Sequence, residues 1–153
     1  MSEVDRILVH YDEVLRGAAW HGDSMWQILE GISAETAAAH AVPEAHTIWE
    51  IVMHMIFWEE VATERLAGRR AGLVEERNFP PMPEHTDEAW SKTLDQLRAS
   101  NRGFREALSQ LDAAKLDALS AAGKRTFYDE AHGLIEHHIY HLGQIVLLKK
   151  AGQ

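Results

Sequence analysis

Near its C-terminus the chain reads EHHIYHLGQ over residues 136–144, which puts three histidines within five residues of an apolar run. Successive residues of an α-helix turn by about 100°, so side chains four positions apart share one face. His137 and His141 therefore present their imidazoles to one point, which is the spacing of metal ligands on a helix. His138 and His141 form a second pair, three residues apart, that spacing alone does not exclude. The stretch predicts a buried helix that carries a metal site.

The same motif argues against a zinc protease. In the H-E-x-x-H motif a glutamate follows the first histidine and acts as the general base. In this chain His138 occupies that position. A metalloprotease is therefore not the favoured function.

Composition limits the class of protein. A chain of 153 residues with 46% hydrophobic content is expected to form one domain over residues 1–153. It has no cysteine, so a metal must be held by His, Asp or Glu. With 24 acidic and 15 basic residues the net charge of −9 repels a phosphate backbone, and we expect no nucleic-acid partner. No run approaches the roughly 20 apolar residues of a membrane span, and the N-terminus lacks a signal-peptide pattern. We therefore expect a cytoplasmic protein with no membrane partner.

Apolar residues recur at three- and four-residue steps, which predicts helices. We expect four helices, over about 3–32, 46–66, 86–111 and 126–148, and Gly17 and Gly22 mark a kink or break in the first of them. No two-residue alternation indicates strands. The fold class is therefore all-α, a four-helix bundle with longer connections at 67–85 and 112–125.

His54 lies in the apolar run of the second predicted helix. Bundles build metal sites from side chains on facing helices, so His54 with His137 and His141 predicts a divalent-metal site with open coordination positions. Glu50 lies one turn before His54. It is a candidate hydrogen-bond partner of His54, a fourth ligand or a general base, and the alternative is an exposed glutamate on the helix rim.

Two stretches together resemble a known family: IWEIVMHMIFWE at 48–59 and HHIYHLGQI at 137–145. They are similar to the DinB-like, or YfiT-like, superfamily of metal-dependent bacterial proteins. The resemblance implies a four-helix bundle of up-down-down-up topology, often a homodimer. It also implies a zinc or nickel ion held by His54, His137 and His141.

The resemblance implies less about activity. Some relatives are thiol S-transferases that use bacillithiol or mycothiol, one is a mycothiol-dependent isomerase, and a related domain occurs in ergothioneine synthesis. We therefore expect a metal-dependent thiol S-transferase that uses a low-molecular-weight thiol on a small-molecule substrate. Two alternatives stay open: a metal-dependent hydrolase, with Glu50 as the candidate base, and a non-catalytic, stress-associated metal-binding protein.

Overall fold

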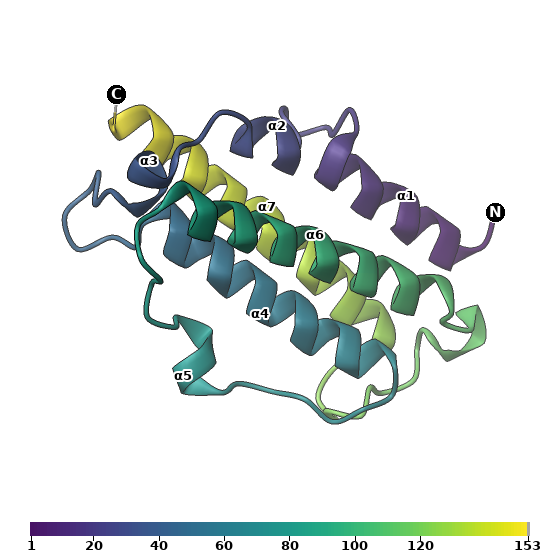
Figure 1. Cartoon of the computed structure of the whole chain (residues 1–153). Helices are drawn as coiled ribbons and strands as arrows, with labels where there is room; N and C mark the ends of the chain where they lie inside the picture. Colours follow the sequence, from purple (N-terminus) through teal and green to yellow (C-terminus); the bar gives the residue numbers. More distant parts are fainter. Residues whose placement is uncertain (153) are drawn as a thin grey trace.

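A computed structural model describes residues 1–152, which are helical with no strand among them (Figure 1). The helices are α1 Glu3–Arg16, α2 Met25–Leu29, α3 Ala34–Ala38, α4 Ile48–Leu66, α5 Glu75–Asn78, α6 Asp87–Ser109 and α7 Phe127–Ala151, and a short 3-10 helix spans Ala113–Lys115. The predicted all-α class is confirmed. The predicted number of four helices was too low, because the connections carry short helices of their own. The up-down-down-up order stays a prediction.

The first predicted helix, 3–32, is wrong as a continuous element. α1 ends at Arg16, and α2 begins only at Met25. Gly22 between them has φ +121°, a backbone conformation that residues with a Cβ rarely adopt. After the break at this glycine, α2 continues along the side of the bundle in the direction of α1 (Figure 1) and contacts both α1 and α7.

Hydroxyl side chains define where the long helices begin. Ser2, Thr47 and Thr126 each accept a hydrogen bond from the backbone N–H three residues later in α1, α4 and α7. In each case the acidic residue at that third position accepts a hydrogen bond from the cap residue in return. Such reciprocal caps satisfy amides that would otherwise lack partners, which fixes the register of each helix start. The caps thereby define where His54 lies along α4 and where His137 and His141 lie along α7.

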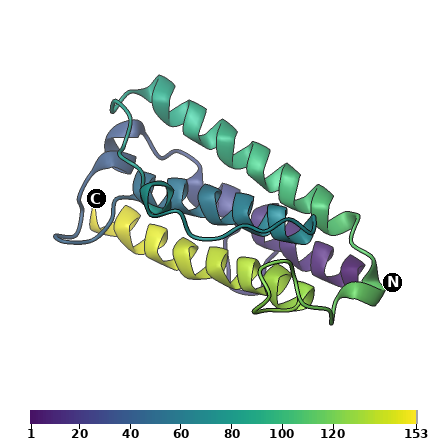
Figure 2. The same ribbon diagram turned by 90° about the horizontal axis from the view of Figure 1, so that it is seen from below.

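The four long helices lie alongside one another, with α4 packed against α6 and α7, and α1 packed against the same two helices (Figures 1 and 2). Their inward faces contribute to one hydrophobic cluster, whose largest fully buried side chains include Trp49, Tyr11 and Phe104. None of the helices in residues 1–152 combines the length and apolar character needed to cross a membrane.

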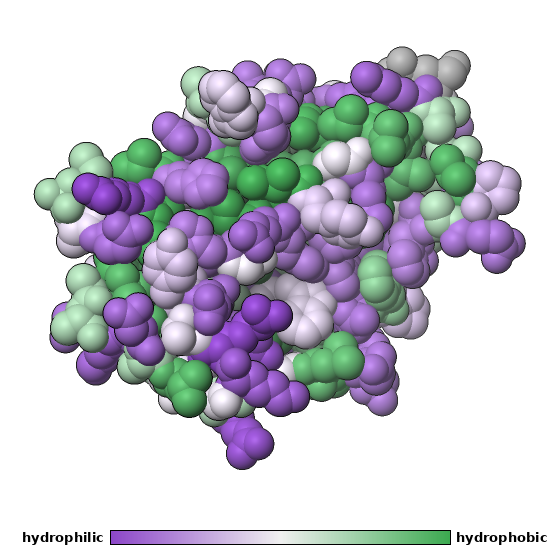
Figure 3. All heavy atoms as spheres, turned by 180° about the vertical axis from the view of Figure 1, so that it is seen from behind, coloured by the Kyte–Doolittle hydropathy of each residue, from purple (hydrophilic) through white to green (hydrophobic). Residues whose placement is uncertain are grey.

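The connection from α4 to α6 runs beside α4 (Figure 1). It contains α5 and then Pro80, Pro81 and Pro83, which lack amide protons and prevent regular structure. α5 contacts α4, so the end of α5 lies against the helix that carries His54. The face opposite to that of Figure 1 shows polar side chains around a band of apolar ones (Figure 3).

Candidate metal centre

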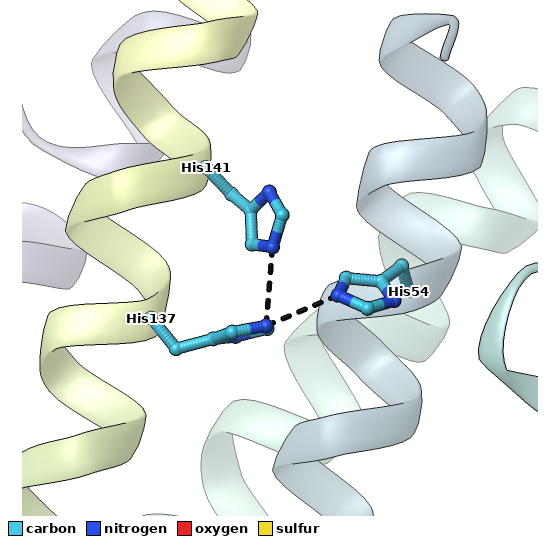
Figure 4. A group of neighbouring side chains, drawn as sticks. All are labelled: His54, His137 and His141. Carbon is cyan, nitrogen blue, oxygen red and sulfur yellow. Dashed lines mark hydrogen bonds between the residues drawn. The ribbon is translucent and has the colours of Figure 1, made fainter.

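Three histidine side chains from two helices converge between α4 and α7 (Figure 4). His54 comes from the middle of α4, and His137 and His141 come from successive turns of α7. The Nε2 atom of His137 lies 3.1 Å from that of His54 and 3.1 Å from that of His141. One ring nitrogen from each residue lies within 4.8 Å of the other two. The three predicted ligands are therefore close enough to bind one metal ion.

Two of the rings have their tautomer fixed by a neighbour. His54 Nδ1 lies 3.0 Å from the backbone carbonyl of Asn78, and His141 Nδ1 lies 2.6 Å from the side-chain carbonyl of Gln144. A carbonyl oxygen only accepts hydrogen bonds, so both Nδ1 atoms carry the proton. In a neutral imidazole the other nitrogen, Nε2, then presents a lone pair, as a metal ligand requires. Both lone pairs face His137.

The arrangement of lone pairs fits a cation. His137 Nε2 carries at most one proton, so it donates to only one of its two neighbours, and the other contact sets two lone pairs against each other. His137 Nδ1 is also buried and has no hydrogen-bond partner among the described residues. Nitrogens bound 2.1 Å from zinc lie about 3.0 Å apart at a right angle and about 3.4 Å apart in a tetrahedron. The two separations of 3.1 Å fall in this range.

The electrostatics of the site keep its imidazoles neutral. Burial, followed by the neighbouring imidazoles of His141, His138 and His54, lowers the pKa of His137 to about 3. Burial also lowers the pKa of His141 to about 4, against the opposing effect of its hydrogen bond to Gln144. The pKa of His54 is lowered too, mainly by burial. All three rings are therefore neutral at pH 7 and free to act as ligands.

His138, the alternative that the spacing left open, is not part of this group of close ligand atoms. Its side chain is fully buried, and Nε2 donates to Glu59 at 3.0 Å. Glu59 is also 0% exposed and accepts from Tyr11, from Ser100 and, at 2.9 and 3.1 Å, from Asn101. Burial and the charge of Glu59 raise the pKa of Tyr11 well above its ordinary value. This network joins α1, α4, α6 and α7 in the core.

Glu50 takes a structural place at the start of α4. Its carboxylate accepts from the backbone N–H of Thr47 at 2.7 Å and lies 3.5 Å from Nδ1 of His46. The hydrogen bond from Thr47 and the nearby His46 lower the pKa of Glu50 against the opposing effect of its partial burial. Glu50 is absent from the group of close ligand atoms, and the partner of His54 is the Asn78 carbonyl instead. Its role as a general base stays a prediction.

Two functional neighbours, Asn78 and Phe79, were missed by the sequence reasoning. The ring of Phe79 stacks on His54 with centroids 4.3 Å apart and planes 9° apart, and on His46 with values of 3.8 Å and 4°. The side chain of Asn78 accepts from Trp58 Nε1 at 3.0 Å, while its carbonyl holds His54. Asn78 at the end of α5 and Phe79 after it thus hold the ring of His54 in position. No periodic signal marks this segment, since its contacts depend on how the connection folds back.

A cavity of about 430 Å³ opens beside His137 between α4 and α7. Its lining includes Trp58 and Leu134, with Tyr140 and Arg125 toward solvent. His54 and His141 do not line it and are each only 7% exposed. Of the three histidines, His137 is the one that borders this cavity.

Comparison with known proteins identifies the family to which this geometry belongs. The family model described as the DinB superfamily matches residues 18–145, a range that contains all three histidines of the site. The resemblance inferred from residues 48–59 and 137–145 is thus confirmed. Searches of curated proteins and of solved structures found no match.

Proposed function

The chain belongs to the DinB superfamily, and from this premise we propose that it is a metal-dependent thiol S-transferase with His54, His137 and His141 as the ligands of a zinc or nickel ion. The observation that carries the proposal is the convergence of three neutral imidazole nitrogens beside a cavity of about 430 Å³. Three-imidazole sites with open positions are typical of catalytic rather than structural metals.

The thiol is a co-substrate, because the chain has no cysteine to supply one. A divalent ion with three imidazole ligands supplies Lewis acidity, which favours the thiolate form of a thiol at neutral pH. In the proposed reaction the thiol sulfur forms a bond to an electrophilic carbon. The leaving group departs with the electron pair of the broken bond, and the thiol proton passes to solvent.

The residues of the chain have separate roles in this proposal. Asn78 and Gln144 hold the rings of His54 and His141 with Nε2 turned to the centre. His137 borders the cavity, so it lies between the other two ligands and the entering molecule. Trp58 contributes an apolar wall next to the site, which limits water around the reacting groups.

The hydrolase alternative has less support. It requires a general base near the ion, and the carboxylate of Glu50 is engaged by Thr47 at the helix start. A homodimer, a small-molecule substrate and a cytoplasmic location stay predictions, as does the non-catalytic metal-binding alternative.

The first test is metal content, measured by elemental analysis on protein purified without chelator. Wild type is compared with His54→Ala and His137→Ala, and His21→Ala is the control because His21 is exposed and outside the site. We expect about one equivalent of divalent metal in wild type and His21→Ala, and its loss in the other two variants. Absence of metal from wild type after incubation with zinc and with nickel would refute the site.

The second test separates the three functions. Metal-loaded protein is incubated with 1-chloro-2,4-dinitrobenzene and either bacillithiol or mycothiol, and separately with 4-nitrophenyl acetate without thiol. The proposal predicts turnover that requires the thiol and is lost in His137→Ala. Turnover by water alone would favour the hydrolase, and metal binding without any turnover would favour the binding protein.

A further inference from the structure

The cavity beside His137 is a groove that runs between α4 and α7. Half of the lining is formed by Trp58, Val61 and Ala62 of α4 and by Gly133, Leu134 and His137 of α7. Five of these six side chains are apolar or absent, and the sixth is a proposed metal ligand. The other half is polar or charged: Arg65, Arg125, Asp129, Glu130, Glu136 and Tyr140. A volume of about 430 Å³ lies in the range of small-molecule sites, about 300–1,000 Å³. The groove therefore has the size and the lining to hold the body of an organic molecule.

Gly133 has no packing reason to be glycine. It lies inside α7, one turn before His137 on the same face, where glycine costs about 1 kcal/mol relative to alanine. A Cβ added at this position would meet no atom within 4 Å, and φ is not in the positive range. Among residues 1–152, neither a neighbouring atom nor the backbone conformation therefore requires a glycine here. Gly133 and His137 line the same groove, and the absence of a side chain at Gly133 leaves this part of the groove open.

The charges along the groove differ between its two ends. Glu136 and Tyr140 lie beside His137, whereas Arg125 precedes the first turn of α7. At 1.5 Å per residue, the helix rises about 15 Å between Phe127 and His137. The guanidinium of Arg125 is exposed, and its positive charge is one of the causes that lower the pKa of Asp129, which also lines the groove. The far end of the groove thus carries an exposed positive charge that Asp129 partly offsets.

The other charged groups at that end are already engaged. Arg65 donates to Glu130 at 2.9 Å and to the carbonyl of Ala71 at 2.9 Å. Glu130 also accepts from Ser120 at 3.0 Å, and Asp129 accepts from the N–H of Thr126 at 3.1 Å. Arg125 is therefore the charged residue at this end whose side chain makes no hydrogen bond with the described residues, which leaves its N–H groups free to donate to a ligand.

We propose that this groove is the substrate-binding site, and that it takes an elongated organic molecule with an apolar body, its reactive group at the three histidines and an anionic group at Arg125. The inference rests on the proposed metal site, since the histidines define the reactive end. The open turn at Gly133 admits the body of the molecule. A guanidinium recognises carboxylate and phosphate groups alike by paired hydrogen bonds, and a carboxylate is the probe used below.

Thiols of different length and charge test the proposal on cobalt(II)-loaded protein. The probes are 8-mercaptooctanoate, 8-mercapto-1-octanol and 2-mercaptoethanol, and each Kd is read from the sulfur-to-cobalt charge-transfer band. We expect wild type to bind the octanoate about two- to fivefold more tightly than the octanol, the effect of one exposed charge pair. Arg125→Gln should abolish this difference and leave the Kd of 2-mercaptoethanol unchanged.

Gly133→Leu fills the groove and should raise the Kd of both long thiols about tenfold or more, while the short thiol binds as before. Gly143→Leu is the matched control, because Gly143 lies on the same helix, a Cβ added there would meet no atom within 4 Å, and the residue does not line the groove. Gly133→Ala adds only one methyl group, so it should raise the Kd of the long thiols less than Gly133→Leu does. Thermal unfolding of the metal-free variants is the second readout, and a Tm at or above that of wild type shows that the fold is intact.

The outcomes separate the groove from the metal site. Equal affinity of Gly133→Leu and wild type for the long thiols would refute the groove, even with cobalt bound. Equal affinity of wild type for the octanoate and the octanol, or an unchanged preference in Arg125→Gln, would refute the anionic end. Failure of wild type to bind cobalt would refute the proposed metal site, and the groove proposal with it.

Discussion

His137 and His138 are neighbours on α7, but their Nε2 atoms belong to different clusters. That of His137 lies 3.1 Å from His54, and that of His138 lies 3.0 Å from the carboxylate of Glu59. Adjacent helical side chains point about 100° apart, so one turns toward the groove and the other toward the core. The candidate metal centre lies on α4 and α7, and the buried network uses these two helices together with α1 and α6. The two clusters share no residue, so each can be changed separately.

Replacement of His141 by alanine should remove metal binding and the stability that metal confers. At a free metal concentration 100 times Kd, binding to the native state raises the free energy of unfolding by about 2.7 kcal/mol. We expect this increment in wild type and in His21→Ala but not in His141→Ala, measured by thermal unfolding with and without zinc. An equal zinc-induced rise in Tm in all three proteins would contradict the assignment of His141 as a ligand.

Replacement of Phe79 or Asn78 by alanine should weaken metal binding without removing a ligand. Loss of groups that orient a metal ligand typically lowers affinity about 10- to 100-fold. Phe79→Ala removes the ring stacked on His54, and Asn78→Ala removes the anchor to Trp58. Competition with a zinc chelator measures the change. Arg77→Gln is the control, because it loses an exposed ion pair with Glu60 and a cation–π contact with Phe57, neither of which involves the three histidines, and it should keep wild-type affinity.

The metal-free protein should lose stability as the pH falls below about 6.5, the ordinary pKa of histidine in the unfolded chain. The pKa is about 3 for His137 and about 4 for His141 in the folded protein. Between these values and 6.5 the unfolded chain binds protons that the folded site does not, so stability rises with pH across this window. Urea unfolding at pH 7.5, 6.5, 5.5 and 4.5 measures the slope.

His141→Ala serves as the comparison for this pH dependence. This variant lacks one of the two imidazoles whose pKa is strongly lowered in the folded protein. Its free energy of unfolding should therefore change less steeply between pH 6.5 and 4.5 than that of wild type. Parallel curves for the two proteins would contradict the lowered pKa of His141. Carboxylates with lowered pKa values, such as Glu50 and Asp129, make stability depend on pH at more acidic values. They are present in both proteins, so they do not cause a difference between the two curves.

Glu59 and Glu60 form a matched pair in the same turn of α4. Glu59→Ala leaves the buried donors of Tyr11, Asn101 and His138 without their acceptor, which should lower the free energy of unfolding by about 3–5 kcal/mol. Glu60→Ala removes an exposed side chain paired with Arg77, and its effect should stay within about 0.5 kcal/mol. Urea unfolding tests both, and similar losses in the two variants would contradict a special role for Glu59.

The sequence predicted which three histidines lie close together because their spacing is a property of single helices. His137 and His141 are four apart, and His54 lies in a run whose apolar neighbours mark a buried face. Asn78 and Phe79 obey no such rule, since their contact with His54 depends on the path of the connection between α4 and α6. Local periodicity carries no information about such a path.

The errors in the fold have similar causes. Apolar spacing continues across Gly17 and Gly22, so it predicts one helix where the backbone breaks. The buried side chain of Asn101 in α6 has a hydrogen-bond partner that the spacing within one helix does not identify. Glu59 is that partner, and it comes from another helix. Pairing between helices is decided by their packing in three dimensions, which short-range patterns do not encode.

His54 and His137 are 83 residues apart in the chain. An ion held between them would act as a cross-link that closes a loop containing α5 and α6. In the chain-entropy model, a permanent link across a loop of this size restricts the unfolded state by about 4.5 kcal/mol. A chain without cysteine would thereby have a reversible metal cross-link in place of a disulfide. Its closure would follow the supply of metal rather than the redox state of the surroundings.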